Sequence, residues 1–158
     1  MDMTVIRDMT PGDLDAVSLL AEQLVLLHHR WDTTRFFTTP DVAKGYRRYF
    51  HSQLGQPGVL LLTAEVDGAV AGYLYGTLED RDWAKLLDAH GALHDVFVDA
   101  QHRRRGVAHA LMNEAKARLQ QLGARQLVLY SASANAEGQA VFRQLGYRST
   151  MVEMTLDL

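Results

Sequence analysis

The chain contains no cysteine, which excludes disulfide bonds, thiolate metal sites and a cysteine nucleophile. This absence suits a reducing compartment, so we expect a cytoplasmic protein. No apolar run approaches the roughly 20 residues that a helix needs to cross a bilayer. The first residues also lack a basic segment followed by an apolar one, so neither membrane insertion nor secretion is predicted.

A surplus of basic residues is also absent, since the formal net charge is -3. Nucleic-acid binding requires a basic face, and we therefore expect no nucleic-acid partner. The seven histidines show no pairing typical of a zinc site, such as H-E-x-x-H, so no metal site is predicted.

The composition that remains is that of an ordinary globular domain. Hydrophobic residues make up 47% and charged residues 22% of the 158 positions. A chain of this length buries one core, and no linker, repeat or low-complexity tract divides it. We expect one domain over residues 1–158.

Hydrophobic periodicity predicts a mixed α/β fold in the order β-α-α-β-β-β-α-β-α-β. The elements expected in the first half are a strand over 4–7, helices over 14–27 and 41–53, and strands over 59–66 and 69–78, joined by the hairpin turn Asp67-Gly68. Those expected in the second half are a loop over 79–89, a strand over 94–98, a helix over 104–122, a strand over 126–130, a helix from Asn135 to Leu145, and a strand over 147–156.

The segment from Asp95 to Ala108 carries the clearest functional signal. A short apolar strand ends, the chain turns through Arg103-Arg104-Arg105, and a helix begins near the small residues Gly106 and Ala108. Free N–H groups at a helix N-terminus, with the helix dipole behind them, bind anions such as a pyrophosphate. Small residues let a phosphate approach the backbone closely. The alternative interpretation is a solvated basic turn.

Two motifs in this half of the chain resemble those of a known family. Arg103-x-x-Gly106-x-Ala108 resembles the (Gln/Arg)-x-x-Gly-x-(Gly/Ala) signature of GNAT acyltransferases. Asn135 and the run from Ala140 to Tyr147 resemble the family's second signature, N…A-x-x-Y-x-x-x-G-F. The resemblance implies the GNAT fold, with acetyl-CoA as the acyl donor. It also implies direct attack on the thioester by a primary amine of a small molecule or peptide in a ternary complex.

The resemblance further implies which residues bind the donor. The coenzyme A-binding residues expected on the strand, the turn and the two following helices are Phe97, Val98, Arg103, Arg104, Arg105, Gly106, Val107, Ala108, Asn135 and Phe142. By the same resemblance, the backbone N–H of Val98 is the catalytic donor to the developing oxyanion.

An alkylammonium acceptor must lose a proton before it can attack, so a base or a water chain is required. Asp95 is the first candidate for binding or orienting the amine, and His94 for accepting its proton. Alternation along a strand places these two side chains on opposite faces, so only one reaches the acceptor unless a bulge intervenes. A helix cap or a surface ion pair is the alternative role for each.

One residue departs from the family pattern. Phe142 stands where the family commonly has a tyrosine that protonates the leaving thiolate. Phenylalanine packs against an apolar arm but donates no proton, so either the thiolate leaves unassisted or another donor serves. Ser131, Ser133 and Tyr147 are the candidates.

Aromatic and acidic residues in two loops are candidates for contacting the acceptor. Trp31 and Phe36 lie in the loop region between the first two helices, and Glu79 and Asp80 follow a predicted strand. Acidic residues favour a cationic acceptor, although loop aromatics often only cover the core and charge runs are often solvated.

Two alternatives to a catalytic monomer remain open. Phe142 is compatible with a non-catalytic domain that binds or senses acyl-CoA. The segment after Gly146 is short for the two final strands usual in the family, which indicates one long strand or pairing with a partner subunit. We therefore include a homodimer among the expectations.

Overall fold

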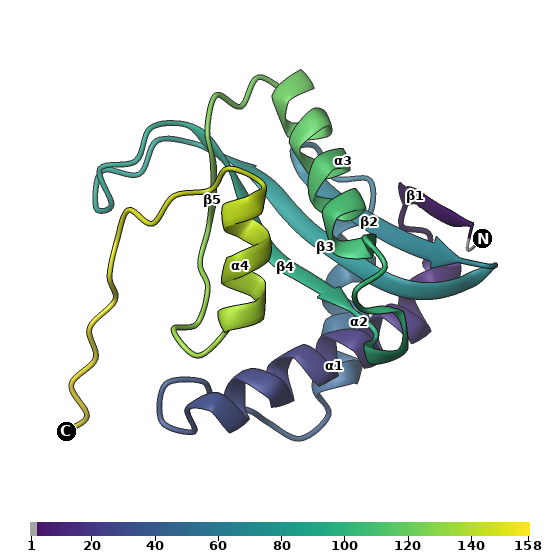
Figure 1. Ribbon diagram of the computed structural model, residues 1–158, viewed down its shortest axis with the longest axis horizontal. Coiled ribbons are helices and arrows are strands. Elements are labelled where there is room, and N and C mark those ends of the chain that lie inside the picture. Colours follow the sequence, from purple (N-terminus) through teal and green to yellow (C-terminus); the bar gives the residue numbers. More distant parts are fainter. Residues whose placement is uncertain (1–2) are drawn as a thin grey trace.

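The computed structural model describes residues 3–158 and contains a twisted sheet with helices on both faces (Figure 1). The strands are β1 (Thr4–Asp8), β2 (Val59–Val66), β3 (Ala69–Glu79), β4 (His90–Val98) and β5 (Leu127–Leu129). The helices are α1 (Leu14–Trp31), α2 (Val42–Gln53), α3 (Val107–Gln121) and α4 (Ala136–Gln144), with short 3-10 turns at Pro11–Asp13 and Ala100–His102. No helix within the described range is long and apolar enough to cross a membrane.

The sheet has the order β1-β2-β3-β4-β5, so each strand lies beside its neighbour in sequence. All neighbouring pairs are antiparallel except β4 and β5, which are parallel and share only three register positions. Asp67 and Gly68 close the β2–β3 hairpin with positive φ angles of 49° and 83°. This conformation is that of a type I′ turn, which confirms the predicted hairpin.

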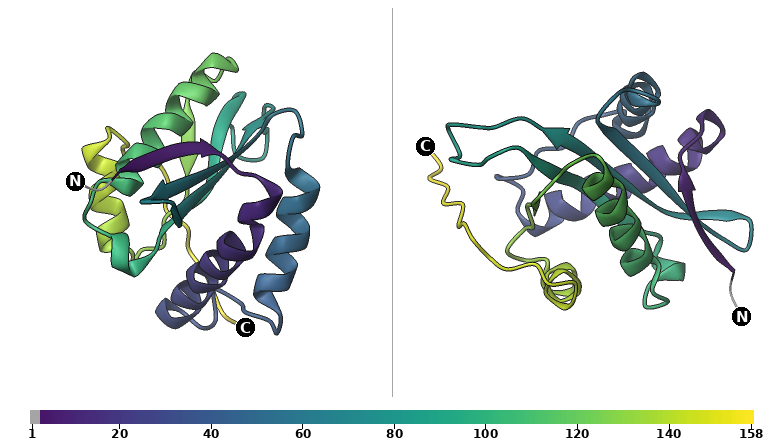
Figure 2. Two further views of the ribbon diagram at one scale, coloured as in Figure 1. Left: turned by 90° about the vertical axis from the view of Figure 1, so that its right-hand side faces the viewer. Right: turned by 90° about the horizontal axis from the view of Figure 1, so that it is seen from above.

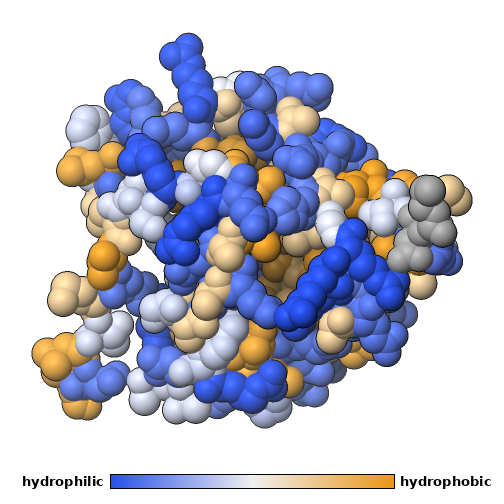
Figure 3. Space-filling model, viewed as in Figure 1, coloured by the Kyte–Doolittle hydropathy of each residue, from blue (hydrophilic) through white to orange (hydrophobic). Residues whose placement is uncertain are grey.

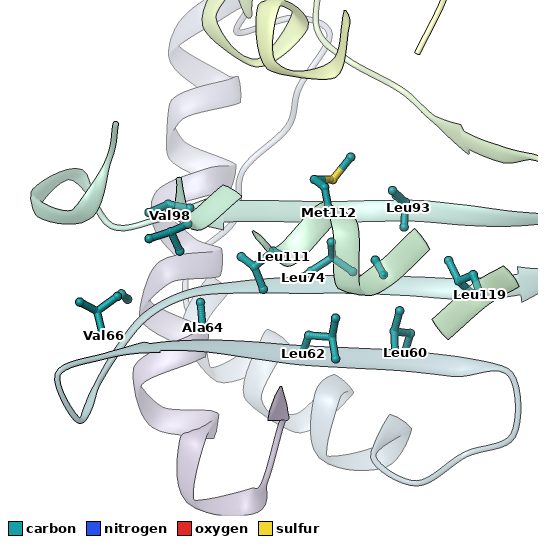
Figure 4. Packing of buried hydrophobic residues seen from close by; sticks show 13 residues of the cluster. Leu60, Leu62, Ala64, Val66, Leu74, Leu93, Val98, Leu111, Met112 and Leu119 are labelled. Atoms are coloured by element: carbon teal, nitrogen blue, oxygen red, sulfur yellow. The ribbon is translucent and has the colours of Figure 1, made fainter. Parts of the chain in front are cut away.

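Each face of the sheet packs on its own helices (Figure 2). On one face, α3 covers alternating apolar residues of β2, β3 and β4, as Figure 4 shows for Leu62, Leu74 and Leu111. On the other face, α1 and α2 cover a more aromatic cluster that includes Tyr73 and Phe50. Both rings are fully buried, so this second face is rigid where it approaches the site.

Four expectations about element bounds were wrong. Helix α1 runs to Trp31, four residues beyond the predicted end, so Trp31 is helical and does not lie in the loop between the first two helices. Strand β4 begins at His90, four residues before the predicted start at His94. Helix α3 begins at Val107, because Arg104 and Gly106 adopt left-handed φ angles of 63° and 79° that cannot continue a helix. The expected closing strand over 147–156 is not formed, and that segment is extended without a partner strand.

Candidate active site

The site forms where β4 and β5 diverge. The two strands pair only from Gly91 to Leu93 on β4, and beyond that point β5 continues into a loop that leads to α4. The gap between them is a cleft that lies among α1, β4, β5 and α4. Its lining residues are Leu24, His28, Leu93, His94, Asp95, Val96, Leu129, Tyr130, Ser131, Asn135 and Phe142.

Main-chain groups of β4 face this cleft. The N–H of Asp99 donates to the carbonyl of Ala71 on β3 at 2.7 Å. Backbone groups of successive residues in an antiparallel strand point to opposite sides, so the N–H groups of Val98 and Val96 point away from β3, towards the side that β5 leaves open. The carbonyl of Val98 accepts a hydrogen bond from Arg103 Nε at 3.1 Å, which leaves its N–H as the group available to a ligand.

The turn after β4 is held by stacking as well as by that hydrogen bond. The Arg103 guanidinium lies 5.3 Å from the ring centroid of Phe97. Arg103 is therefore occupied in fixing the end of β4, whereas Arg104 and Arg105 extend the exposed surface beside it. Arg104 lies 3.7 Å from Glu137 at the start of α4, so the turn and α4 meet at the mouth of the cleft.

Helix α3 starts from this turn with its N-terminal amides directed outward. Gly106 is the N-cap, and its carbonyl accepts from Ala110 N at 3.0 Å in the first helical turn. The amides of Val107, Ala108 and His109 precede that first helical bond, so they carry the partial positive charge of the helix N-terminus. A Cβ on Gly106 would meet no atom within 4 Å, so its positive φ is what requires glycine there, and not crowding by the protein.

A bulge in β4 brings the two predicted acid–base residues to one face. Asp95 pairs with Tyr75, but Gly76 pairs with Leu93, so His94 is an extra residue in the ladder. The alternation therefore breaks between His94 and Asp95, and both side chains lie on the face that α1 and α2 cover. We expected that only one could do so without a bulge.

Asp95 is held by a buried phenol. Tyr73 Oη donates to Asp95 Oδ2 at 2.9 Å. Burial raises the pKa of the Asp95 carboxyl, and the hydrogen bond from Tyr73 and the nearby His94 and His28 oppose that rise. Burial also raises the pKa of Tyr46 to about 12, with the charge of Asp95 adding to it. The phenols around this carboxylate therefore stay protonated and act as hydrogen-bond donors.

His94 sits in a chain of hydrogen bonds that defines its tautomer. Its Nε2 lies 2.7 Å from Thr77 Oγ1, and Thr77 donates to Glu79 Oε1 at 2.5 Å. A carboxylate only accepts, so the single Thr77 hydroxyl proton goes to Glu79 and His94 Nε2–H must donate to the Thr77 oxygen. Neutral His94 is thus protonated on Nε2 and keeps a free lone pair on Nδ1. The ring packs on Tyr75 at 4.9 Å between centroids, which fixes its orientation.

Strand β3 supplies residues that the sequence reasoning missed. Tyr73, Tyr75, Thr77 and Glu79 recur at every second position and line the same face of the sheet. Tyr75 Oη also lies 2.7 Å from Tyr49 Oη on α2. The period-two run of hydroxyl and carboxyl side chains was visible in the sequence, but only the register with β4 connects it to His94 and Asp95.

The aromatic residues proposed for the acceptor loop gather around one histidine. The rings of Trp31 and Phe36 lie 4.9 Å and 5.1 Å from the ring of His28, which itself lines the cleft. His28 Nδ1 donates to the Leu24 carbonyl at 2.8 Å, so its Nε2 is the free nitrogen. Trp31 and Phe36 thus support a wall of the site without lining the cleft, and Asp80 is exposed beyond the end of β3.

Some residues of α4 and the preceding loop stabilise the helix, and others line the cleft. Asn135 caps α4 by accepting from Gly138 N at 3.0 Å. Phe142 lines the cleft and packs edge-on against Tyr147 at 6.2 Å. Of the three candidate proton donors, Ser131 is the one that lines the cleft, while Tyr147 packs behind Phe142.

Known proteins share this architecture. A GCN5-related N-acetyltransferase from Ralstonia eutropha is 23% identical, with a TM-score of 0.75 and 99% of each chain covered. The aminoglycoside acetyltransferase AAC(6')-Iy, solved with a CoA bisubstrate analogue, is 22% identical, with a TM-score of 0.78 and coverage of 99% of this chain and 98% of that one. A predicted acetyltransferase from Clostridium acetobutylicum, solved with acetyl-CoA, is 14% identical, with a TM-score of 0.74 and coverage of 98% and 96%.

The family model for the acetyltransferase (GNAT) family matches residues 25–147, which include β4, the arginine turn, α3 and α4. The matched segment is most of the chain and contains every residue that lines the cleft except Leu24. The chain is therefore a member of the GNAT acetyltransferase family.

Proposed function

We propose that the protein transfers the acetyl group of acetyl-CoA to a primary amine of a small molecule or peptide by direct attack in a ternary complex. The observation that carries this proposal is the construction of β4. Its backbone N–H groups at Val96 and Val98 point away from β3 to the side that β5 leaves open, and its bulge turns His94 and Asp95 to one face of the sheet. One strand thus serves both the acyl donor and the amine.

The residues of the cleft fit the parts of acetyl-CoA. The pyrophosphate would bind the outward amides at the start of α3, with Arg104 and Arg105 adding positive charge. The apolar walls from Leu93, Val96 and Phe142 suit the pantetheine arm. Relatives of the same fold solved with CoA or acetyl-CoA support this donor.

The thioester carbonyl would lie at the end of β4. As the amine nitrogen bonds to the carbonyl carbon, negative charge develops on the carbonyl oxygen, and the N–H of Val98 donates to it. The C–S bond then breaks, and its electron pair leaves with the thiolate. The second amine proton balances this charge, and Ser131 is placed to pass it to sulfur because it lines the same cleft.

Asp95 and His94 have different roles towards the amine. Asp95 attracts the ammonium form, and His94 Nδ1 takes one proton to release the nucleophilic lone pair. The imidazolium then passes its Nε2 proton through Thr77 Oγ1 to Glu79, whose side chain is 46% exposed and exchanges protons with water. The relay neutralises the imidazolium but leaves the proton from the amine on Nδ1, so His94 returns to its Nε2–H tautomer by exchanging protons with water before the next turnover.

The acceptor that best fits is a cationic amine. Asp95 and Glu79 supply negative charge on the acceptor side, and the ring of His28 lines the cleft with Trp31 and Phe36 packed edge-on behind it. The aminoglycoside acetyltransferases among the structural neighbours support a small-molecule amine. A cytoplasmic location and a homodimeric assembly complete the proposal.

The experiment is a thiol-release assay with acetyl-CoA and a panel of aminoglycosides, polyamines and lysine peptides. We expect release of CoA that requires an amine, an acetylated amine in the mass spectrum, and strong loss of both in His94→Gln. The control is His109→Gln, whose ring lies on α3 beside Gln144 and outside the cleft. Equal activity of the His94→Gln variant and the wild type would contradict the role given to His94.

A second candidate function rests on Phe142. Because this residue donates no proton, the cleft is also compatible with a domain that binds acyl-CoA without turnover. Such a domain would bind acetyl-CoA in a titration and release no thiol with any amine of the panel.

A further inference from the structure

His28 is a polar residue of the cleft to which the proposed reaction gives no role. The polar side chains that line the cleft from α1 and β4 are His28, His94 and Asp95. His94 and Asp95 act on the amine, whereas His28 does not. Figure 3 shows the face of the molecule on which α3 and α4 lie, with an apolar hollow among hydrophilic surface side chains. A polar atom that opens onto largely apolar walls takes its partner from the ligand when the ligand excludes water.

The ring of His28 is held so that one nitrogen remains for a ligand. Its Nδ1 lies 2.8 Å from the carbonyl of Leu24, one helical turn earlier, and the rings of Trp31 and Phe36 pack edge-on against it. A carbonyl only accepts, so neutral His28 has its proton on Nδ1 and a lone pair on Nε2. Within residues 3–158 Nε2 has no hydrogen-bond partner, and the half-buried ring leaves it accessible from the cleft.

The side chains of this part of the cleft accept hydrogen bonds and do not donate them to a ligand. His94 uses its Nε2 proton on Thr77, which leaves a lone pair on Nδ1. The Asp95 carboxylate accepts from Tyr73 Oη at 2.9 Å and has further lone pairs. With His28 Nε2, three side chains on α1 and β4 therefore require donors from the acceptor molecule.

The protons of the reacting amine do not supply all three. A primary ammonium has three N–H bonds. In the proposed reaction one proton goes to His94, a second passes by way of Ser131 to sulfur, and the third stays on the product nitrogen, where Asp95 accepts from it. None remains for His28. The donor that matches His28 therefore belongs to another group of the acceptor.

We propose that His28 Nε2 accepts a hydrogen bond from a hydroxyl or a second amino group near the reacting amine. His28 thus determines specificity, and the enzyme prefers amino alcohols and diamines to simple alkylamines. The charge of His28 acts on the pKa of Asp95, so the two side chains are close enough for one small acceptor to reach both. This inference rests on the proposed acetyl transfer to an amine.

A set of matched acceptors tests the preference. The acceptors are 3-aminopropanol, its O-methyl ether, which accepts hydrogen bonds but does not donate them, and 1,3-diaminopropane. A hydrogen bond of ordinary strength predicts a kcat/KM about 10-fold higher for the alcohol, the diamine or both than for the ether. Whichever of the two is preferred identifies the second group as a hydroxyl or an amine.

The substitution His28→Phe keeps an aromatic ring against Trp31 and Phe36 but removes both nitrogens. We expect the preference over the ether to fall to about one in this variant, with activity on the ether retained. The control His51→Phe changes an exposed ring on α2, outside the cleft, and should keep the wild-type preference. A wild type without the preference, or a preference that His28→Phe leaves intact, overturns the proposal.

Nitrogen-15 spectra of histidine-labelled wild type with bound CoA test the same contact without turnover. The His28 signals are assigned by their absence from His28→Phe or, if that variant does not fold, from His28→Gln. We expect 3-aminopropanol or 1,3-diaminopropane to move the Nε2 signal and the ether to leave it in place. Equal shifts with all three, or none, overturn the role of His28. Shifts of the expected kind in a protein that acetylates no amine would instead contradict the proposed reaction.

Discussion

Residues around His94 show how a single extra position in a strand creates a site. The bulge at β4 places the imidazole against Tyr75 and in hydrogen-bond contact with Thr77, and the Glu79 carboxylate fixes the direction of the proton in that contact. None of these side chains is unusual by itself. The hydrogen-bond chain from His94 through Thr77 to Glu79 is what fixes the tautomer of His94.

Removing the Thr77 hydroxyl should break the hydrogen-bond chain between His94 and Glu79 without changing the shape of the site. We expect Thr77→Val to lower kcat less than His94→Gln, for which loss of the base predicts about 10²-fold. Steady-state kinetics, with Thr150→Val in the exposed segment after α4 as control, measure this. An unchanged kcat in Thr77→Val would rule out the relay.

Asp95 should make the protein less stable as pH rises. Its folded-state pKa lies above its unfolded value, so the native state holds this proton longer, and the associated stability is lost as pH rises through the folded pKa. Asp95→Asn keeps the acceptor for Tyr73 and removes the charge. We expect a higher free energy of urea unfolding than wild type at pH 7, together with a raised KM for the amine. A variant less stable than wild type at pH 7 would contradict this account.

Asp13 should have the opposite pH dependence. Arg7 donates to its carboxylate, which lowers the pKa of Asp13 from 3.8 to about 2 although burial opposes the shift. Its contribution is therefore present above the unfolded pKa and lost as pH falls through about 2. We expect Asp13→Asn to lower the free energy of unfolding at pH 7 by about 2 kcal/mol and to flatten the acid limb. Urea unfolding at pH 7 and at low pH gives both numbers, and an unchanged acid limb would contradict the assignment.

At the scale of elements, the start of α3 determines the geometry of the proposed anion site. Gly106 has a φ of 79°, which costs an L-residue about 1–2 kcal/mol. Gly106→Ala should therefore lower stability by about 1 kcal/mol and weaken acetyl-CoA binding, because the turn must shift.

Gly45 offers a matched control, since it lies in α2 with nothing within 4 Å of a new Cβ and without a positive φ. Gly45→Ala should stabilise the protein by about 0.5–1 kcal/mol. Thermal unfolding of both variants measures the contrast. Equal effects of the two substitutions would show that backbone conformation at position 106 is unimportant.

Much of the element pattern could be predicted from periodicity, because α1, α2, β2 and β3 carry strong local signals such as the Asp67-Gly68 turn. The bulge at His94 could not, since it exists only in the register between two strands. The start of α3 was misplaced because the left-handed Arg104 has no local sequence signal of the kind that glycine gives. The closing strand over 147–156 has strand-like alternation, but alternation does not specify which chain supplies the neighbouring strand.

At the scale of the whole molecule, the cleft forms because β5 pairs with only one end of β4. The N-terminal end of β4 pairs with β5, whereas the C-terminal end lies beyond β5 and leads into the turn that contains Arg103, Arg104 and Arg105. Val98, Gly106, Asn135 and Phe142 could be proposed as donor-binding residues because the motifs that carry them are contiguous in the sequence. The residues around His94 and Asp95 could be predicted less completely, because Tyr73, Thr77 and His28 come from distant segments.

The measurement that tests the account most directly is a calorimetric titration of acetyl-CoA into the wild type and into Gly106→Trp. An indole at Gly106 would stand over the outward amides of α3, where an added Cβ meets only open space, and would block a phosphate. We predict saturable binding of one acetyl-CoA per wild-type chain and loss of binding in the variant, with circular dichroism showing that both are folded. Absence of wild-type binding at millimolar acetyl-CoA, or equal binding by both proteins, would contradict the assignment of this cleft to the acyl donor.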